Sequence, residues 1–141
     1  MVGALCRTHS LKVAREVARE QLRVVRLDHK TDFLAGGLPI GERKKLEVAR
    51  VLATKPELLL LDEVMGGLNP AESEEIILLI LELKKLGLTQ VVIEHDMKAI
   101  MRMSDRIVVL NSGEKLAEGG PSEVAHNKDV IAAYLGGEVD A

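Results

Sequence analysis

The sequence predicts an α/β fold, and three observations lead to this prediction. The apolar run 58–61 lies between a proline and two acids, which suits a short strand buried on both faces. Helical and β-branched segments then alternate, with further strands expected at 90–94 and 106–110. This order indicates a mostly parallel sheet with crossover helices. An Asn-Ser-Gly turn leads into a fourth strand at 115–118, which predicts an antiparallel hairpin at the sheet edge.

Residues before about 55 show helical patterns and no strand, so they are expected to form a small helical lobe beside the sheet. Ser10 is expected to cap a helix over residues 10–26, because apolar residues recur there at helical spacing. A glycine-rich turn then precedes a second helix at about 42–53. The predicted division is a helical part at residues 1–55 and the rest of an α/β core at residues 56–141.

The remaining helices are predicted from their end signals. Asn69 is expected at an N-cap, with Pro70 at the first helical position and Glu72 completing a capping box, and Gly87 ends this helix. Further helices are expected to begin at three polar or turn-forming positions, the last of them running to Leu135 with Gly136 as its stop. These positions are Asp96, Pro121 and Asp129.

Composition and charge exclude several classes of protein. The 141 residues carry a net charge of −3 with a pI near 5.8, which argues against nucleic-acid binding through a basic face. The single cysteine, Cys6, rules out an internal disulfide and favours a reducing compartment. The longest apolar runs, 58–61 and 76–81, are far shorter than the roughly 20 residues that cross a bilayer. With no leader pattern at Met1, we expect a cytoplasmic protein that reaches a membrane only through a partner.

Two acids follow the first strand, where parallel sheets place ligand-binding groups. Asp62 could hold magnesium through water, and Glu63 could polarise an attacking water, which are the carboxylate roles that phosphoryl transfer needs. The simpler alternative is a core strand that ends in a solvated acidic loop. Gly41 precedes a helix, whose N-terminus is a potential phosphate site or an ordinary helix start. His95, taken alone, favours a capping or packing role.

The order of these segments resembles the ATP-binding-cassette (ABC) ATPases from about Ser10 onward. By this resemblance Asp62 is the Walker B aspartate that binds Mg²⁺, Glu63 the catalytic glutamate, and His95 the switch histidine that contacts the γ-phosphate of ATP. Asn69 holds the D-loop position usually taken by aspartate. The signature loop, which faces ATP on the opposite subunit of a dimer, corresponds to Leu38, Pro39, Ile40, Gly41 and Glu42.

The match departs from the family pattern at several positions. Val64 replaces the proline after the catalytic glutamate, and Pro39, Ile40 and Glu42 replace the signature serine, glycine and glutamine. The lost serine hydroxyl removes one phosphate donor. The Gly-Leu-Asn-Pro D-loop, the Ile-Glu-His-Asp-Met switch and the tail 129–136 are similar to the ATP-binding subunits of branched-chain amino-acid importers. That resemblance implies transmembrane permease subunits and a second ATP-binding subunit as partners, at the cytoplasmic face of the cell membrane.

No G-x-x-x-x-G-K-S/T motif, the P-loop, occurs in these 141 residues. The chain therefore resembles the C-terminal part of an ABC nucleotide-binding domain, which is a partial P-loop NTPase fold. We expect the chain by itself to be inactive as an ATPase, and its sheet edge to invite self-association. One hypothesis is a piece of an importer ATPase. The alternatives are a non-catalytic interaction module, or an ABC ATPase of another system such as lipopolysaccharide export.

Overall fold

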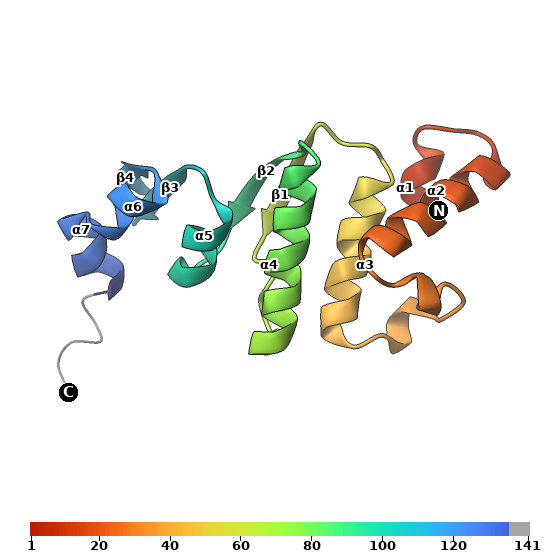
Figure 1. The fold of residues 1–141 in the computed structure, drawn as a ribbon, viewed down its shortest axis with the longest axis horizontal. Coiled ribbons are helices and arrows are strands. Elements are labelled where there is room, and N and C mark those ends of the chain that lie inside the picture. Colours follow the sequence, from red (N-terminus) through yellow and green to blue (C-terminus); the bar gives the residue numbers. More distant parts are fainter. Residues whose placement is uncertain (136–141) are drawn as a thin grey trace. The chain divides into compact units, whose positions relative to one another are not determined.

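The computed structural model describes residues 1–135, so the predicted stop at Gly136 lies outside the described residues. The chain forms two compact units, which divide between Ile93 and Glu94. Each unit is described by itself. Figure 1 labels their helices and strands in chain order. Among the described residues, no helix combines the length and the apolar character needed to cross a bilayer.

The first unit begins with helices that pack closely through small residues. They are α1 (Val2–Leu5), α2 (Leu11–Val24), the 3₁₀ turns η1 (Asp28–Lys30) and η2 (Ala35–Gly37), and α3 (Ile40–Leu52). Ser10 caps α2 as predicted, its Oγ accepting from the amide of Val13 at 3.4 Å. Ala4, Ala14 and Ala53 form a buried cluster, and a Cβ at Gly3 would overlap the carbonyl oxygen of Arg50. The helical lobe is therefore held together by close backbone approach.

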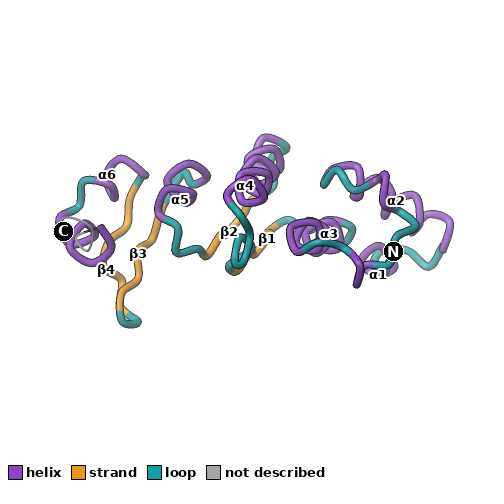
Figure 2. The backbone as a smooth tube through the Cα atoms, turned by 90° about the horizontal axis from the view of Figure 1, so that it is seen from below, coloured by secondary structure: helices purple, strands orange, loops and turns teal. Residues whose placement is uncertain are grey.

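A parallel strand pair joined by a crossover helix follows in the same unit. Strand β1 (Leu58–Asp62) pairs with β2 (Thr89–Ile93) in a register that sets Leu58 beside Thr89 and Asp62 beside Ile93. Helix α4 (Pro70–Lys85) connects them and covers one face of the pair, as Figures 1 and 2 show. Gln90 identifies that face, because its Nε2 donates to the carbonyl of Ile80 in α4 at 2.9 Å.

The expectation that β1 is buried on both faces is wrong for the described residues. Leu59 and Leu61 are buried on the α4 side, whereas Leu58 and Leu60 on the other side are 49% and 69% exposed. Alternation along a strand sends successive side chains to opposite faces, and within the described residues only one face of this pair has a covering layer.

The helix boundaries of the first unit follow the predicted signals closely. Asn69 and Glu72 form the expected capping box of α4, and Gly87 follows its end with a positive φ of 84°. Helix α3 begins at Ile40, two residues earlier than expected, with Pro39 at its N-cap position. A proline ahead of a helix is compatible with this start, since the first turn needs no N–H donor from it.

The second unit contains α5 (Met97–Met103), a hairpin and the C-terminal helices. The hairpin of β3 (Ile107–Asn111) and β4 (Glu114–Gly119) is antiparallel, as predicted. Within the described residues β3 pairs only with β4, so the parallel part of the fold has two strands and the predicted third strand does not extend it. The remaining helical segments are α6 (Pro121–Ala125), α7 (Lys128–Val130) and the π-helical η3 (Ile131–Leu135).

The start of the last helical segment differs from the prediction at Asp129. Asn127 caps α7 instead, because its Oδ1 accepts from the amides of Asp129 and Val130 at 2.9 and 3.2 Å. Tyr134 ties η3 to the hairpin, since its hydroxyl donates to the carbonyl of Leu110 at 2.5 Å. The cap therefore lies two residues earlier than the sequence pattern indicated.

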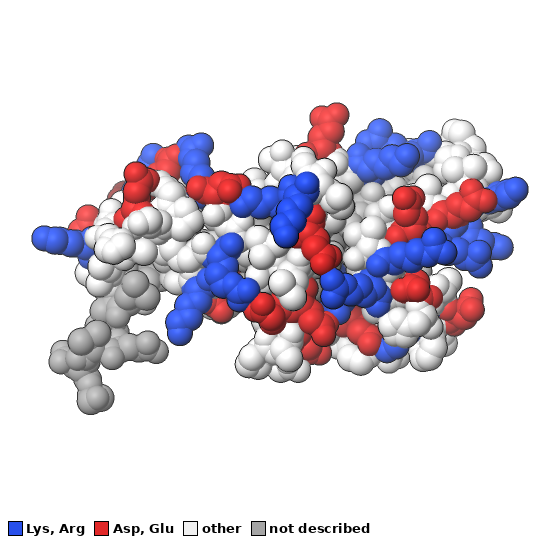
Figure 3. All heavy atoms as spheres, in the orientation of Figure 1, with Lys and Arg blue, Asp and Glu red and all other residues white. Residues whose placement is uncertain are grey.

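Charged side chains of both signs are interspersed on the face shown in Figure 3. Several form ion pairs within their own unit, such as Arg26 with Glu82 at 2.7 Å and Lys115 with Glu118 at 3.0 Å. Arg26 and Glu82 are largely exposed, so their pair contributes little to stability.

Candidate functional site

The carboxyl end of β1 presents both predicted acids to solvent. Asp62 is the last residue of the strand, on the face away from α4, and Glu63 follows it with its amide donating to the carbonyl of Ile93 at 2.9 Å. Glu63 adopts a positive φ of 45°, an unusual conformation for a residue with a Cβ. Strained backbone of this kind is found preferentially at functional positions.

A tight turn after Glu63 carries the chain toward α4. The amide of Gly66 donates to the carbonyl of Glu63 at 3.0 Å, and Gly67 takes a φ of 78° that favours glycine. Val64 is buried, so the valine at the position of the family's proline packs into the first unit. Asn69 then caps α4, its Oδ1 accepting from the amide of Glu72 at 3.0 Å.

The predicted signature loop lies against this turn. A Cβ built on Gly41 would be 2.8 Å from a carboxylate oxygen of Glu72, and one on Gly67 would be 3.3 Å from Cδ1 of Ile40. Glu72 also accepts from the amide of Asn69 at 3.1 Å, so a single carboxylate contacts both predicted motifs. The structure therefore brings the signature and D-loop positions together within one unit.

The other signature residues divide between core and surface. Leu38 is buried, whereas Pro39 and Ile40 are exposed. Glu42 is half-buried and pairs with Lys30 at 2.5 and 2.6 Å. Glu42, which stands where the family has glutamine, thus has the ammonium group of Lys30 beside it to offset its charge. The first backbone N–H groups of α3 still have no partners inside the helix.

Two lysines of α3 reach the same region, and the sequence analysis did not single them out. Lys44 donates to the carbonyl oxygen of Glu63 at 3.4 Å, and Lys45 forms an ion pair with Glu75 of α4. Lys44 and Lys45 follow Gly41 by three and four residues, a spacing that places them on the same face of α3 as Gly41. This spacing was the signal that could have identified them from the sequence. Lys44 contacts the main chain of the strained residue itself, so α3 supports the turn that carries the predicted catalytic carboxylate.

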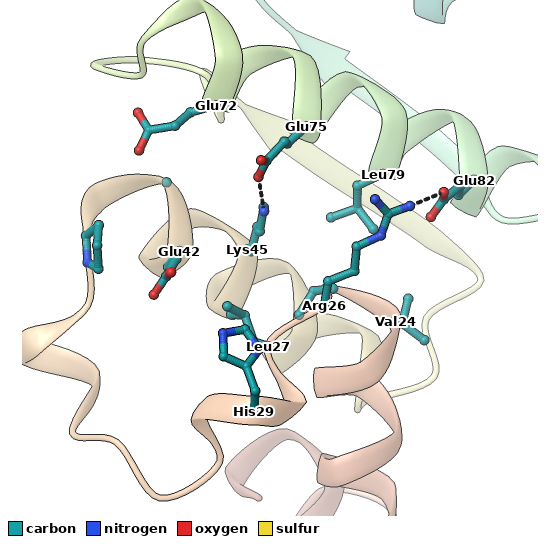
Figure 4. A pocket seen from close by; sticks show the side chains of 13 residues that line it. Val24, Arg26, Leu27, His29, Glu42, Lys45, Glu72, Glu75, Leu79 and Glu82 are labelled. Atoms are coloured by element: carbon teal, nitrogen blue, oxygen red, sulfur yellow. Dashed lines mark hydrogen bonds and ion pairs between the residues drawn. The ribbon is translucent and has the colours of Figure 1, made fainter.

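A cavity of about 420 Å³ lies beside these contacts, between the end of α2, the start of α3 and α4. Figure 4 shows Glu42 and Lys45 of α3 and Glu72 of α4 around it, with His29 of η1. His29 of η1 therefore lines a cavity that the sequence did not reveal.

His95 lies in the second unit, two residues after the end of β2, and its side chain is exposed. The neighbouring Asp96 caps α5 as predicted, its Oδ1 accepting from the amide of Ala99 at 3.1 Å. The grouping of His95 with Asp62 and Glu63 stays a prediction.

Asp62 and Glu63 suit Mg²⁺ binding only where nucleotide phosphates supply further ligands to the ion. Among residues 1–135, no three or more His, Cys, Asp or Glu side chains are arranged to hold a metal ion. Proteins commonly bind Mg²⁺ through one or two carboxylates together with substrate phosphates. Asp62 at the strand end can supply one such carboxylate.

Comparison with known proteins gives two family matches and several relatives. Residues 6–66 match the ABC transporter family, and residues 114–140 match the branched-chain amino acid ATP-binding cassette transporter family. Among solved structures, the ADP conformation of MJ1267, an ATP-binding cassette of an ABC transporter, is 32% identical with a TM-score of 0.78, covering 86% of this chain and 49% of that one. The cbiO1 protein from Clostridium perfringens is 30% identical with a TM-score of 0.80, over 94% and 53%.

The chain therefore corresponds to the C-terminal part of an ATP-binding domain of an ABC transporter, and the predicted fold class is confirmed. This family generally uses ATP with Mg²⁺.

Within the family the chain is similar to branched-chain amino-acid transport ATP-binding proteins. BraF of Pseudomonas aeruginosa is 44% identical over 128 residues, which are 90% of this chain and 50% of BraF. LivG of Escherichia coli K12 is 42% identical over 142 residues, 96% of this chain and 55% of LivG. The chain spans about half the length of the curated relatives that it matches.

Proposed function

We propose that this chain supplies the C-terminal half of the ATP-binding subunit of an ABC importer for branched-chain amino acids. The observation that carries the proposal is the contact between the signature and D-loop positions, made by Gly41 on Glu72 and by Ile40 on Gly67. It is supported by the similarity to BraF and LivG, whose names give branched-chain amino-acid transport as their role.

The proposed site residues act at the end of β1. Bound ATP and Mg²⁺ would supply the transferable γ-phosphoryl group and neutralise its charge. Asp62 contributes a carboxylate to the metal, and Glu63 orients and polarises the attacking water. The hydrogen bond from Lys44 to the Glu63 carbonyl supports the backbone from which that carboxylate projects.

His95 is proposed to contact the γ-phosphate from the segment after β2. The segment Leu38 to Glu42 would face ATP on a second ATP-binding subunit through its exposed Pro39 and Ile40 and the N-terminus of α3, while Leu38 and Gly41 are buried. Asn69 then lies at the same seam between subunits.

The subunit is proposed to work at the cytoplasmic face of the membrane with transmembrane permease subunits. The 141 residues contain no P-loop motif. Most of the hydrogen-bond donors to the ATP phosphates would therefore have to come from polypeptide outside these 141 residues. The chain by itself is expected to show no ATPase activity above background. Turnover that Glu63→Gln abolishes would contradict that expectation.

A chimera tests the proposed function directly. The chain replaces the matching half of E. coli LivG, and leucine uptake is measured in cells that lack LivG. We expect uptake to be restored, and Glu63→Gln to remove it. The control Glu57→Gln alters an exposed glutamate just before β1 and is expected to leave uptake unchanged.

Chimeric protein that is present at normal levels yet supports no ATP hydrolysis would contradict the importer-ATPase proposal. It would favour the non-catalytic interaction module instead. Self-association of the chain through the β1–β2 pair, which has no further paired strand among the described residues, is measured by light scattering on the same preparations. A monomer at high concentration would contradict it.

A further inference from the structure

The carbonyl group of Glu63 accepts hydrogen bonds from two different parts of the first unit. The amide of Gly66 donates to it at 3.0 Å from the turn that follows, and Nζ of Lys44 donates to it at 3.4 Å from α3. The amide of Glu63 donates in turn to the carbonyl of Ile93 at 2.9 Å. Lys44 therefore adds a bond from the helical part of the chain to a residue that the turn and β2 also hold.

The strained backbone of Glu63 gives that bond its importance. Its φ of 45° lies in the left-handed region, which residues with a Cβ avoid. Such a conformation persists only where the surrounding structure over-determines it. One hydrogen bond shifts a local equilibrium about five-fold, so the loss of the Lys44 bond would let the Glu63 backbone leave this conformation more often. The carboxylate that projects from it would then be less precisely directed.

The length of the Lys44 bond makes it sensitive to the position of α3. Its 3.4 Å exceeds the usual upper limit of about 3.2 Å for an N–H···O bond, so a small displacement of α3 changes its strength. Helix α3 begins at Ile40, inside the segment that is proposed to face ATP on the second subunit. Lys44 follows Ile40 by four residues, which is about one helical turn. A change at the start of α3 is therefore felt directly at Lys44.

We propose that Lys44 is a positioning residue that links the two ATP sites of the dimer, an inference that rests on the proposed function and adds a means of regulation to it. In that dimer the start of α3 contributes to the site of the second subunit's ATP, while Glu63 acts on the ATP of its own subunit. ATP held at the start of α3 fixes this helix, and with it the distance from Nζ of Lys44 to the Glu63 carbonyl. Occupancy of one site thereby positions the carboxylate at the other. Lys44 acts through the main chain of Glu63 and contacts no nucleotide.

The test uses the chimera in which this chain replaces the matching half of E. coli LivG, purified as the assembled importer. The rate of ATP hydrolysis is measured against ATP concentration. We expect a Hill coefficient above one, because Glu63 is best positioned when both sites are occupied. Lys44→Met removes the donor and keeps the side-chain length, so it should lower kcat about five-fold and bring the Hill coefficient close to one. The affinity for a non-hydrolysable ATP analogue should change by less than about two-fold.

Two further variants separate positioning from a merely structural role. Lys44→Arg keeps a cationic donor and should restore most of the lost kcat. Arg43→Met is the matched control, since Arg43 is the exposed neighbouring cation of α3, and it should leave kcat and the Hill coefficient unchanged. A structural role would lower the yield of folded protein and leave the Hill coefficient as it was. Either that result or an unchanged kcat in the Lys44→Met chimera would overturn the inference.

A second measurement, on the 141-residue chain itself, tests the contact without ATP. Hydrogen exchange at the amide of Gly66 reports on the carbonyl that Gly66 shares with Lys44. Lys44→Met should raise this exchange by about two-fold or more, and Arg43→Met should not. Equal exchange in the two variants would overturn the inference.

The proposed function fails in a different way. A chimera that hydrolyses no ATP with Lys44 in place counts against the importer ATPase itself, and the link between its sites falls with it. A chimera that hydrolyses ATP and restores leucine uptake, yet does not respond to Lys44→Met, supports the importer ATPase and overturns the role of Lys44 alone.

Discussion

The cap of α4 offers a sharp test of the link between the signature and D-loop positions. Asn69→Ala removes the side-chain oxygen that accepts from the amide of Glu72 at 3.0 Å, while the reciprocal bond from the Asn69 amide to the Glu72 carboxylate can persist. Loss of an N-cap side chain costs about 1 kcal/mol. The opening equilibrium of the first turn of α4 should therefore rise about five-fold.

Amide hydrogen exchange at Glu72 measures this change at the donor itself. Asn69→Asp is the matched variant, because aspartate caps helices as well as asparagine does and is the residue usual in the family's D-loop. It should leave exchange unchanged, and Asn69→Gly should show only a small increase.

Equal exchange at Glu72 in the alanine and aspartate variants would refute the role given to the cap. Amides in α2 provide an internal reference, since that helix has its own cap at Ser10 and does not depend on Asn69. A parallel rise there would mean that the whole unit had lost stability.

Other expectations concern the strands, the strained acid and the C-terminal contact. Leu59→Ala should lower the free energy of unfolding by about 2–5 kcal/mol in urea titrations, whereas Leu60→Ala on the face away from α4 should change it by less than about 0.5 kcal/mol; similar losses would contradict the assignment of faces. Glu63→Asn should leave the free energy of unfolding nearly unchanged, whereas Glu63→Val should lower it by more than about 1 kcal/mol, since a β-branched residue resists positive φ. A valine variant more stable than the asparagine variant would contradict the strained turn at Glu63. Tyr134→Phe should cost about 1 kcal/mol by removing the bond to Leu110, and no change in the unfolding midpoint of the second unit would disprove that bond's contribution.

Local signals in the sequence were sufficient for most helix ends. Ser10, Asn69 and Asp96 were predicted as caps, and each accepts a backbone amide within the next three residues. Caps depend on groups close in the chain, so sequence patterns predict them well. Asp129 failed because Asn127, two residues earlier, offers an equally suitable oxygen, and only the backbone path decides between them.

The candidate site was predictable as a set of positions and not as a set of contacts. The order of the acids, the glycine-led helix and the Asn-Pro helix start carried the resemblance to ABC ATPases. The contact of Gly41 with Glu72 and the bond from Lys44 to Glu63 join residues 19 or more positions apart, and such contacts follow from packing rather than from spacing.

By itself, the sequence determined most helix caps, the alternation of helices and strands along the chain, and which family the motif order resembles, because these properties depend on neighbours along the chain. Only the tertiary structure decided that Leu59 is buried while Leu60 is exposed, and that the start of α3 supports the turn at Glu63. Burial of a face is a property of whatever packs on it, and here α4 packs on one side of β1 alone.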